Sequence, residues 1–379
     1  MKKVLFITTI SGFLQQFEMN DVNIVQELGY EVYYASNFYN PVYEMSREVL
    51  RKHNISLHQI DIQKSPFNIL KNFKAWKQLR KVLQKEHIDV IHCHNPMGGV
   101  LGRLATIGIK EKIHVIYTAH GFHFYKGAPV LNWLLYYPVE LLLAKRTDKL
   151  ITINDEDYKR AKKFRIRENG VVKKIPGVGV DTERFGRHIG EREKIRKELD
   201  ISENEFFILS VGELNANKNH QIIMHAIARL QDRNIRYGIC GRGPAEEELR
   251  RLAIELGIEE QVTLYGFRKD IPRMLAAADC FAFPSKREGL GIAALEAMAA
   301  GIPMITSDCR GTREYMQHAI NGYVCKKGTV EEYMTAIYSM QISKEKCEMF
   351  AVACRKTAEK FDIKVTDKIM RQVYADLPK

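Results

Sequence analysis

Two glutamates eight positions apart, Glu288 and Glu296, are the residues of this sequence best suited to chemistry. An apolar run over residues 278–284, typical of a buried strand, precedes them, and helix-forming residues follow as far as Gly301. The segment predicts a strand, a loop containing Glu288 and a short helix containing Glu296. Eight helical residues rise about 12 Å. The two carboxylates therefore suit different parts of one extended ligand, such as a nucleotide carrying a sugar.

The loop between this strand and helix contains Gly289, Leu290 and Gly291. Glycine lets a backbone approach a ligand closely, and free N–H groups at a helix N-terminus attract a phosphate. We therefore expect backbone contacts from these three residues to a phosphorylated ligand.

Other predicted strands in the second half also end in loops that combine glycine with polar side chains. Lys218 follows the loop that begins at Gly212, where we expect it to open the next helix and place a point charge on a diphosphate. Taken alone, a lysine such as Lys218 is more often a solvated loop residue, and a glycine loop such as 240–244 is more often only a tight turn. Five consecutive strand ends of this kind favour one shared binding site, and the further candidate residues are Gly241, Gly243, Gly266, Phe267 and the segment 311–314.

Strand-like and helix-like segments alternate through the whole chain, which predicts an α/β protein with parallel sheets covered on both faces. A chain of 379 residues, 45% of them hydrophobic, is long enough for two domains with separate cores. The Gly/Pro-rich stretch 175–181 is the best candidate linker. The expected strands are 3–10, 31–36, 90–92, 114–118, 149–153, 206–211, 235–240, 262–265, 280–284 and 303–306, and the expected first-half helices are 16–28, 41–53, 71–86, 98–108 and 131–145.

Several features limit the class of protein. The seven cysteines are scattered and have no Cys-x-x-Cys spacing, which favours reduced structural thiols over a disulfide framework or a zinc site. The apolar N-terminal run is too short for a signal peptide and is interpreted as a first buried strand. The longest apolar stretch, residues 130–144, contains Pro138 and Glu140 and is shorter than the about 20 residues that cross a bilayer.

Histidines mark the ends of two predicted strands in the first half. His120 precedes a glycine at a strand end, where it could contact a ligand or only order the loop. His92 and His94 alternate on one strand and so share a face. No third ligand accompanies them at a suitable spacing, so we predict no metal site and expect strand packing, with His94 at the edge of a cleft.

At this level the sequence resembles the family-4 glycosyltransferases of the GT-B fold over essentially its whole length. The segment from Glu288 to Glu296 resembles the E-x7-E motif of that family, and Lys218 resembles its donor-phosphate lysine. Asn321-Gly322 resembles its Asn-Gly signature. The segment 117–129, Tyr-Thr-Ala-His-Gly-Phe-His-Phe-Tyr-Lys-Gly-Ala-Pro, is similar to a bacterial branch that builds exopolysaccharide, capsule or O-antigen units.

The resemblance implies two doubly wound Rossmann-like domains that face a central cleft. Residues 1–180, joined by a C-terminal helix over 362–379, would form the acceptor-side domain, and residues 181–361 the nucleotide-sugar domain. It also implies a retaining transfer without a metal or other cofactor. The donor would be a UDP-sugar, either an N-acetylhexosamine or a hexose, and the acceptor a polyprenyl-diphosphate-linked saccharide.

The resemblance also assigns roles to single residues. Lys218, Glu288 and His120 would be catalytic, with Glu288 on the sugar hydroxyls and Glu296 on the ribose. One departure is Glu213 after Gly212, where many relatives have arginine; Arg242 or Arg313 are candidates to compensate. The other donor-side residues would be Gly12, Gly212, Gly241, Gly243, Gly266, Phe267, Gly289, Leu290 and Gly291, and the acceptor-side residues His94, His120 and His123.

The net charge of +12 is concentrated in the first half, where residues 1–183 hold 27 Lys/Arg and 18 Asp/Glu. The segment Lys64–Lys85 has seven basic residues, no acid and apolar residues at helical spacing. It is interpreted as a basic amphipathic helix that packs on the sheet and attracts an anionic membrane. We therefore expect a cytoplasmic protein bound peripherally to the inner face of the membrane.

Alternative functions remain open at the level of sequence. A transferase with a GDP donor or another acceptor would look similar. A glycoside hydrolase could use two carboxylates, but the phosphate-ready loops argue against it. A basic nucleic-acid-binding protein is disfavoured because no recognition motif or aromatic stacking platform accompanies the charge.

Overall fold

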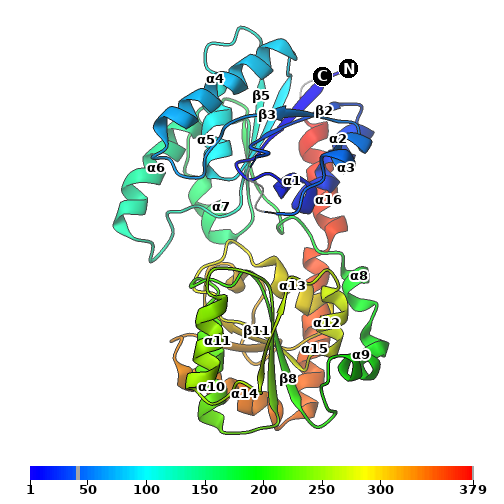
Figure 1. Ribbon diagram of the computed structural model, residues 1–379. Helices are drawn as coiled ribbons and strands as arrows, with labels where there is room; N and C mark the ends of the chain where they lie inside the picture. The colour runs from blue at the N-terminus through cyan, green and yellow to red at the C-terminus, as the bar shows by residue number, and fades with distance from the viewer. Residues whose placement is uncertain (40–42, 378–379) are drawn as a thin grey trace. The chain divides into compact units, whose positions relative to one another are not determined.

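The computed structural model describes residues 1–39 and 43–377 (Figure 1). The chain divides into two compact units, one formed by Met1–Val178 with Lys364–Lys379 and the other by Gly179–Ile363. Each unit contains one parallel sheet with helices on both faces, so the predicted pair of doubly wound domains is confirmed. The chain passes from the first unit to the second inside the Gly/Pro-rich stretch 175–181.

The first unit, here unit 1, has a seven-stranded sheet in the order β3-β2-β1-β4-β5-β6-β7. Its elements are β1 (Lys3–Ile7), α1 (Phe13–Phe17), α2 (Met19–Glu27), β2 (Glu31–Ser36), α3 (Arg47–Lys52), β3 (Ile55–Gln59), α4 (Ile69–Lys85), β4 (Val90–His94), α5 (Pro96–Ala105), β5 (His114–Ala119), α6 (Val130–Ala144), β6 (Lys149–Thr152), α7 (Asp155–Ala161), β7 (Val171–Lys174) and the returning α16 (Ile363–Ala375).

The two-residue period of a strand assigns the side chains of unit 1 to opposite faces of its sheet. Ile91 and Cys93 of β4 belong to the core under α4, α5 and α6. His92 and His94 point to the other face, where α1, α2 and α16 lie (Figure 1). This register places both histidines of β4 against the Phe6 ring of β1.

The second unit, here unit 2, has a six-stranded sheet in the order β10-β9-β8-β11-β12-β13. Its elements are α8 (Thr182–Gly186), η1 (Ile189–Glu191), α9 (Arg192–Glu198), β8 (Phe206–Val211), α10 (Gln221–Leu230), β9 (Ile235–Cys240), α11 (Glu246–Glu255), β10 (Val262–Gly266), α12 (Ile271–Ala277), β11 (Cys280–Phe283), α13 (Ile292–Ala299), β12 (Met304–Ser307), η2 (Thr312–Glu314), β13 (Gly322–Cys325), α14 (Val330–Gln341), α15 (Lys344–Ala358) and η3 (Glu359–Phe361).

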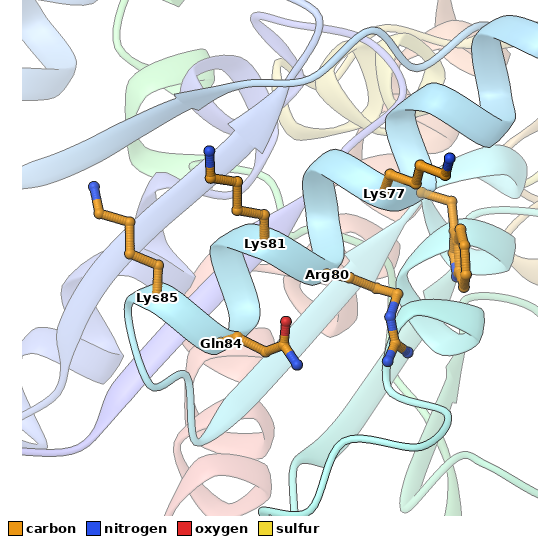
Figure 2. Close-up of a pocket in the computed structure, with 6 residues that line it drawn as sticks. Lys77, Arg80, Lys81, Gln84 and Lys85 are labelled. Atoms are coloured by element: carbon orange, nitrogen blue, oxygen red, sulfur yellow. The ribbon is translucent and has the colours of Figure 1, made fainter.

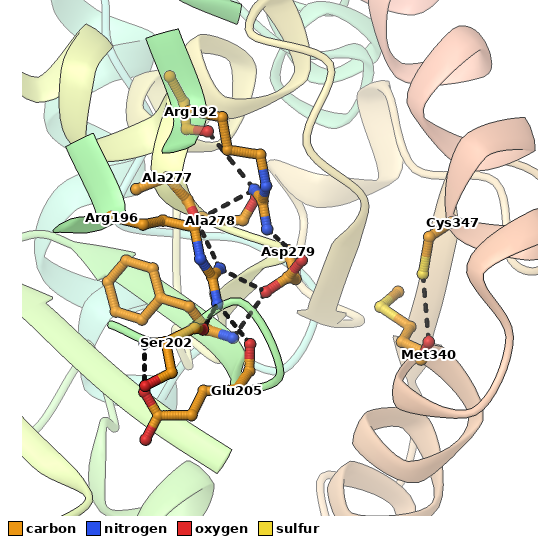
Figure 3. A network of polar contacts seen from close by, with 11 residues as sticks. Arg192, Arg196, Ser202, Glu205, Ala277, Ala278, Asp279, Met340 and Cys347 are labelled. Carbon is orange, nitrogen blue, oxygen red and sulfur yellow. Dashed lines mark hydrogen bonds and ion pairs between the residues drawn. The ribbon is translucent and has the colours of Figure 1, made fainter. Parts of the chain in front are cut away.

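A buried arginine fixes α9 to the sheet of unit 2 (Figure 3). Arg196 donates to Asp279 at 3.0 Å and to the carbonyl oxygens of Ser202 and Glu205, both at 2.6 Å. Arg192 pairs with the second oxygen of Asp279. Because Asp279 directly precedes β11, this network fixes the strand whose far end leads to Glu288.

The structure corrects several sequence-based predictions. Three strands were not predicted: β3, β7 and β13. The single helix expected over 16–28 is two helices, α1 and α2, which break at Glu18. The helix expected over 41–53 begins at Arg47 among the described residues, and its expected start at Pro41 lies outside them.

Candidate functional site

Two loops of unit 2 meet at the point where the strand order of its sheet reverses. β8 has β9 on one side and β11 on the other, so the connections after β8 and β11 diverge to opposite faces. Ligands of doubly wound sheets bind at such a point, beside the carboxyl ends of the strands. The loop after β8 carries Lys218 and the loop after β11 carries Glu288, so this strand order brings the two predicted residues together.

Lys218 and Glu288 form an ion pair in which Nζ lies 2.7 Å from Oε1. The side chains are 19% and 14% exposed, so the pair is largely shielded but still reachable. The lysine ammonium also lies 5.0 Å from the centre of the Phe283 ring. Lys218 lies three residues before α10, so the prediction that it opens this helix is wrong. The site thus holds one cation and one anion in direct contact.

Backbone contacts hold the two loops together next to this pair. The N–H of Lys286 donates to the carbonyl oxygen of Asn217 at 2.8 Å. The Asn217 side-chain amide donates to the carbonyl oxygen of Arg287 at 3.0 Å. These hydrogen bonds fix the two loops beside each other, and with them the backbone positions of Lys218 and Glu288.

The predicted glycines of unit 2 lie where loops approach each other. A Cβ on Gly241 would lie 1.8 Å from the carbonyl oxygen of Gly212, and one on Gly243 would lie 2.3 Å from that of Leu214. Gly291, with φ of 92°, precedes α13, and a Cβ there would meet the Phe283 ring at 2.8 Å. Loop packing therefore requires glycine at these positions, whatever ligand contacts they also make.

The remaining candidate residues after β10 and β11 differ in exposure. Gly266 has φ of 66° and open space where a Cβ would be. Phe267, which follows it, is 54% exposed, whereas Leu290 is buried. Gly289 lies between Glu288 and Leu290 and is partly exposed. An exposed aromatic ring next to an open glycine leaves a flat apolar surface available to a ligand.

Glu296 lies inside α13, as predicted, and is partly exposed as a residue. Burial raises the pKa of Glu296 to about 7, and the positive charge of Arg184 on α8 offsets only part of this effect. Desolvation therefore disfavours the charged form of this carboxyl group, and hydroxyl donors of a ligand would stabilise that form.

The two arginines considered as substitutes for an arginine after Gly212 differ in their surroundings. Arg313 donates to the Asp308 carboxylate at 2.7 Å and is occupied by that pair. Arg242 is exposed, as is Glu213. Lys218 is the cation that contacts Glu288 directly.

In unit 1 the strand order reverses between β1 and β4, and three ionisable side chains meet beside these strands. Glu18 lies at the break between α1 and α2, His94 ends β4, and His120 directly follows β5. His94 Nδ1 lies 3.1 Å from His120 Nε2. Glu18 Oε1 lies 3.4 Å from the first nitrogen and 3.5 Å from the second. We call these three residues the Glu18 cluster.

The Glu18 cluster is largely buried, and solvent reaches it at His120. His94 is fully buried, and His120 is 19% exposed at its side chain. Burial raises the pKa of Glu18 well above its usual value, with a smaller contribution from the Asp21 carboxylate. Burial lowers the pKa of His120 to about 4 and that of His94 well below its usual value. These environments favour neutral side chains in the free protein.

A second polar chain connects β4 to the C-terminal helix. The Tyr374 hydroxyl on α16 lies 2.6 Å from His92 Nδ1 and donates to Asp21 at 2.8 Å. His92 Nε2 lies 2.8 Å from the Thr118 hydroxyl. His92 is therefore fully satisfied by protein partners, in agreement with the expectation of a packing role.

Gly12 and His123 lie on different parts of unit 1. Gly12 has φ of 81°, and a Cβ there would come within 2.8 Å of the Tyr43 carbonyl oxygen. The His123 ring packs against Tyr136 of α6, with ring centres 4.7 Å apart. His123 is not among the residues of the Glu18 cluster.

Sequence reasoning did not find Glu18. It treated residues 16–28 as one continuous helix, in which Glu18 would be an ordinary first-turn acid. It also found no third ionisable residue to accompany His92 and His94, because it considered only spacing along the chain, whereas Glu18 and His120 come from other elements. The helix break and the strand order bring the three together.

Comparisons with known proteins bear on the whole chain. Residues 3–154 match the family described as Glycosyl transferase 4-like, and residues 191–357 match Glycosyl transferases group 1. The chain is also 38% identical over 379 residues to EpsD of Bacillus subtilis strain 168, named as a glycosyltransferase, covering 99% of this chain and 96% of EpsD.

The chain belongs to the family-4 glycosyltransferases. This membership confirms the predicted resemblance, including the bacterial polysaccharide branch. A further relative is the UDP-Gal:alpha-D-GlcNAc-diphosphoundecaprenol alpha-1,3-galactosyltransferase of Escherichia coli. It is 29% identical over 320 residues, covering 82% of this chain and 81% of the relative.

Solved structures show the same fold for this glycosyltransferase. HepE of Anabaena, solved with UDP and glucose, matches with a TM-score of 0.79 at 21% identity and covers 100% of both chains. WaaG, a glycosyltransferase involved in lipopolysaccharide biosynthesis, matches with a TM-score of 0.76 at 18% identity, again over 100% of both chains. At these identities the likeness concerns the fold, and it confirms the GT-B prediction.

Proposed function

We propose that this glycosyltransferase moves a sugar from a UDP-sugar to a lipid-linked saccharide, with retention of anomeric configuration, during surface polysaccharide synthesis. The observation that supports this most directly is the Lys218–Glu288 pair between glycine-containing loops at the strand-order reversal of unit 2. Two similar proteins support this proposal: the Escherichia coli relative is named for transfer from UDP-galactose to a diphosphoundecaprenol-linked sugar, and HepE, which has the same fold, was also solved with UDP-glucose. The sugar is an N-acetylhexosamine or a hexose.

The ion pair of the free protein would separate when the donor binds. Lys218 Nζ would move from Glu288 to the diphosphate, where a point charge stabilises the leaving group. Glu288 would then be free to accept hydrogen bonds from hydroxyl groups of the donor sugar. One ion pair without net charge is thus replaced by two charge-assisted contacts, one from Lys218 and one from Glu288. Because both groups are already partly shielded from water, donor binding adds little desolvation cost.

The other donor contacts follow from the surroundings of this pair. Glu296 would accept hydrogen bonds from the ribose hydroxyls, and the exposed Phe267 ring would contact the base. The loops containing Gly212, Gly241, Gly243, Gly266, Gly289, Leu290 and Gly291 would supply backbone N–H groups and room for the diphosphate.

Unit 1 would bind the acceptor and the transferred sugar. His120 is the exposed member of the Glu18 cluster and would contact the sugar or the acceptor. His94 is fully buried, so we propose that it orients His120 and does not touch the acceptor itself. Gly12 would give the diphosphate-sugar room to approach, and His123 would lie on the acceptor side.

The transfer step needs no covalent enzyme intermediate. The bond between the anomeric carbon and the diphosphate oxygen breaks, and the acceptor oxygen bonds to the same carbon. The acceptor proton passes to the departing diphosphate oxygen, so Lys218 supports the charge that develops there. No metal is required for this step in our proposal.

The test is a panel of nucleotide-sugars incubated with the protein and a short lipid-diphosphate saccharide, with released nucleoside diphosphate as the readout. We expect release from a UDP-sugar that depends on the acceptor. The variants Lys218→Ala and Glu288→Gln should nearly abolish it, whereas Lys194→Ala, which removes an exposed lysine of α9, should not. Release from a GDP-sugar alone, or sugar release without any nucleotide donor, would refute the proposed donor.

We also propose that unit 1 binds an anionic membrane at the cytoplasmic face. The α4 surface presents Lys77, Arg80, Lys81 and Lys85 along an open depression of about 470 Å³ (Figure 2). At the start of the helix, apolar side chains that would otherwise pack inside are exposed, namely Phe67, Ile69, Leu70 and Phe73. The expectation that the whole apolar face packs on the sheet is therefore correct only for the later turns, where Leu79 and Leu83 are buried.

Helix α6 adds a second, uncharged surface. Val130, Leu131, Leu134 and Leu142 are between 61% and 73% exposed. The sole charged residue of α6, Glu140, is buried against Arg103 at 2.8 Å. α4 and α6 both contact α5, so cationic and apolar groups flank one helix. Among the described residues, no helix has the length and apolar character needed to cross a bilayer.

The membrane proposal is tested with vesicles of anionic and of neutral phospholipid. Replacing Leu131, Leu134 and Leu142 by glutamine should release the protein from anionic vesicles, since each buried leucine contributes about 1–2 kcal/mol. A matched control replaces the similarly exposed Ile254, Ile342 and Val352 of unit 2 by glutamine and should leave binding unchanged. Equal loss in both variants, or no binding by the wild type, would refute the proposal.

A further inference from the structure

The outward nitrogen of His120 is the one that a substrate can reach. Nε2 of His120 faces the protein, 3.1 Å from His94 Nδ1 and 3.5 Å from Glu18 Oε1. Nδ1, on the other side of the ring, hydrogen-bonds to no protein group among the described residues. The side chain is 19% exposed, so Nδ1 is the atom left for the contact with the sugar or the acceptor proposed above.

The group bound to Nε2 decides which hydrogen bond Nδ1 can make. Burial lowers the pKa of His120 to about 4, so the ring is neutral and carries one proton. When Nε2 accepts a hydrogen bond, the proton is on Nδ1, which then donates to an oxygen atom of a ligand. The buried groups beside Nε2 therefore set the role of His120.

His94 supplies one proton to the Glu18 cluster. Its Nε2 is buried and has no hydrogen-bond partner among the described residues. A buried N–H without a partner is tolerated less often than a buried acceptor without one, so the proton of this neutral ring is better placed on Nδ1. There it faces Glu18 Oε1 at 3.4 Å and His120 Nε2 at 3.1 Å.

Glu18 is the member of the cluster that is able to join the two histidines. In the part of the chain that the structure describes, its buried Oε1 has no hydrogen-bond partner, although it lies 3.4 and 3.5 Å from the two imidazole nitrogens. Burial raises the pKa of Glu18 well above its usual value, with a smaller contribution from Asp21. The neutral carboxyl group can accept one hydrogen bond and donate another. Such bonds are often long in a free enzyme and shorten when the substrate binds.

The backbone holds Glu18 in place for this role. Its N–H donates to the carbonyl oxygen of Leu14 in α1 at 2.9 Å, and its carbonyl oxygen accepts from the N–H of Val22 in α2 at 3.1 Å. Phe13 packs edge-on against His120, with ring centres 4.9 Å apart. Because the backbone of Glu18 and the ring of His120 are both restrained, a small rotation of the Glu18 side chain closes the hydrogen bond between them.

We propose that Glu18 is a positioning residue whose carboxyl group hydrogen-bonds to His120 Nε2 when the substrate binds and so directs the Nδ1–H of His120 at an oxygen atom of the sugar or the acceptor. His94 then donates its Nδ1–H to Glu18 Oε1, and one chain of hydrogen bonds runs from His94 through Glu18 and His120 to the substrate. This inference rests on the proposed function, in which His120 makes that contact.

The experiment measures transfer from the UDP-sugar that wild type uses to the lipid-diphosphate saccharide. Glu18→Met keeps the length of the side chain but removes its donor, and it should lower kcat/KM about 10- to 100-fold, because a misplaced contact group costs rate on this scale. Glu18→Gln should retain most of the activity, because its amide also accepts and donates. UDP affinity, a property of unit 2, should be unchanged in both variants.

Thermal unfolding separates this role from a structural one. The Tm of Glu18→Met should not fall, because Oε1 has no hydrogen bond to lose. If this variant does not fold, Glu18→Ala takes its place. The matched control is Glu48→Met, which makes the same replacement at an exposed glutamate of α3 and should transfer as wild type does.

A double variant tests whether Glu18 acts through His120. His120→Ala should lower transfer, and adding Glu18→Met to it should cause no further loss. A Glu18→Met variant as active as the control would overturn the inference. So would a Glu18→Gln variant as impaired as Glu18→Met, or a further loss in the double variant. These results leave the proposed function intact, whereas an active His120→Ala would remove the proposed contact and this inference with it.

Discussion

Replacing Glu296 by glutamine should stabilise the free protein and weaken its nucleotide binding. Glu296 is partly exposed on α13, and desolvation of its carboxyl group raises its pKa to about 7 from the ordinary value of 4.5. In the unfolded chain the same group ionises about 2.5 pH units lower. Glutamine has nearly the same shape and hydrogen-bonding oxygen but never carries the charge, so it mimics the protonated acid at every pH.

The size of the effect follows from proton linkage. Between pH 4.5 and 7 the folded state retains a proton that the unfolded state has lost, so stability falls as pH rises through this window. At 1.4 kcal/mol per unit of pKa shift, the wild type loses about 1 kcal/mol by about pH 5.5 and about 3 kcal/mol by about pH 8. Glu296→Gln should avoid this loss. Its free energy of unfolding relative to that of wild type should therefore be about 2 kcal/mol larger at about pH 8 than at about pH 5.5.

The assay is thermal unfolding of wild type and variant near both pH values. For a unit of this size, 1 kcal/mol corresponds to about 2–4 °C in Tm, so the advantage of the variant should be several degrees larger near pH 8. Glu255→Gln, an exposed glutamate at the end of α11, is the matched control and should follow wild type. The two units can unfold in separate transitions. The transition of wild type whose Tm rises when UDP is added is assigned to unit 2, because UDP binds the folded state of that unit.

Two results would refute this reasoning separately. Equal Tm values for wild type and Glu296→Gln near pH 8 would mean that the carboxylate is well solvated in the folded protein. A stabilised variant that binds UDP as tightly as wild type would keep the burial argument but remove Glu296 from the proposed ribose contact.

Other perturbations test separate parts of the structure. Lys218→Ala should lower the transfer rate more than UDP affinity, because its charge matters most as the diphosphate leaves; equal losses in kinetics and in a UDP titration would make it a plain binding residue. Gly291→Ala should destabilise unit 2 by at least about 1–3 kcal/mol in urea unfolding, because its Cβ would meet an aromatic ring at 2.8 Å. Gly257→Ala, also at positive φ but in open space, should cost less, and equal costs would show that backbone strain alone decides. Arg103→Ala should destabilise unit 1 by about 3–5 kcal/mol by leaving the buried Glu140 unpaired, and an unchanged urea midpoint would show that water solvates this carboxylate.

Patterns that are local in the chain predicted most of the fold. The alternation of apolar runs with helical periods located ten strands and the two-domain class, because core burial imposes these periods over short windows. Short strands such as Val171–Lys174 and Gly322–Cys325 were missed because they span four residues each and lie at a sheet edge, where few side chains need to be buried. The position of Glu288 ahead of a helix and of Glu296 inside it was also readable, since both follow from one strand, loop and helix.

Tertiary structure alone decided how these residues are combined. Which strands are neighbours depends on crossovers between distant segments, so the contact between Lys218 and Glu288, 70 positions apart, requires β8 to pair with β11. The meeting of Glu18 with His94 and His120 depends in the same way on β1 pairing with β4 and β4 with β5. The sequence shows that carboxyl and imidazole groups lie at strand ends. Long-range packing determines which of them meet and how far water reaches them, and therefore determines their charge.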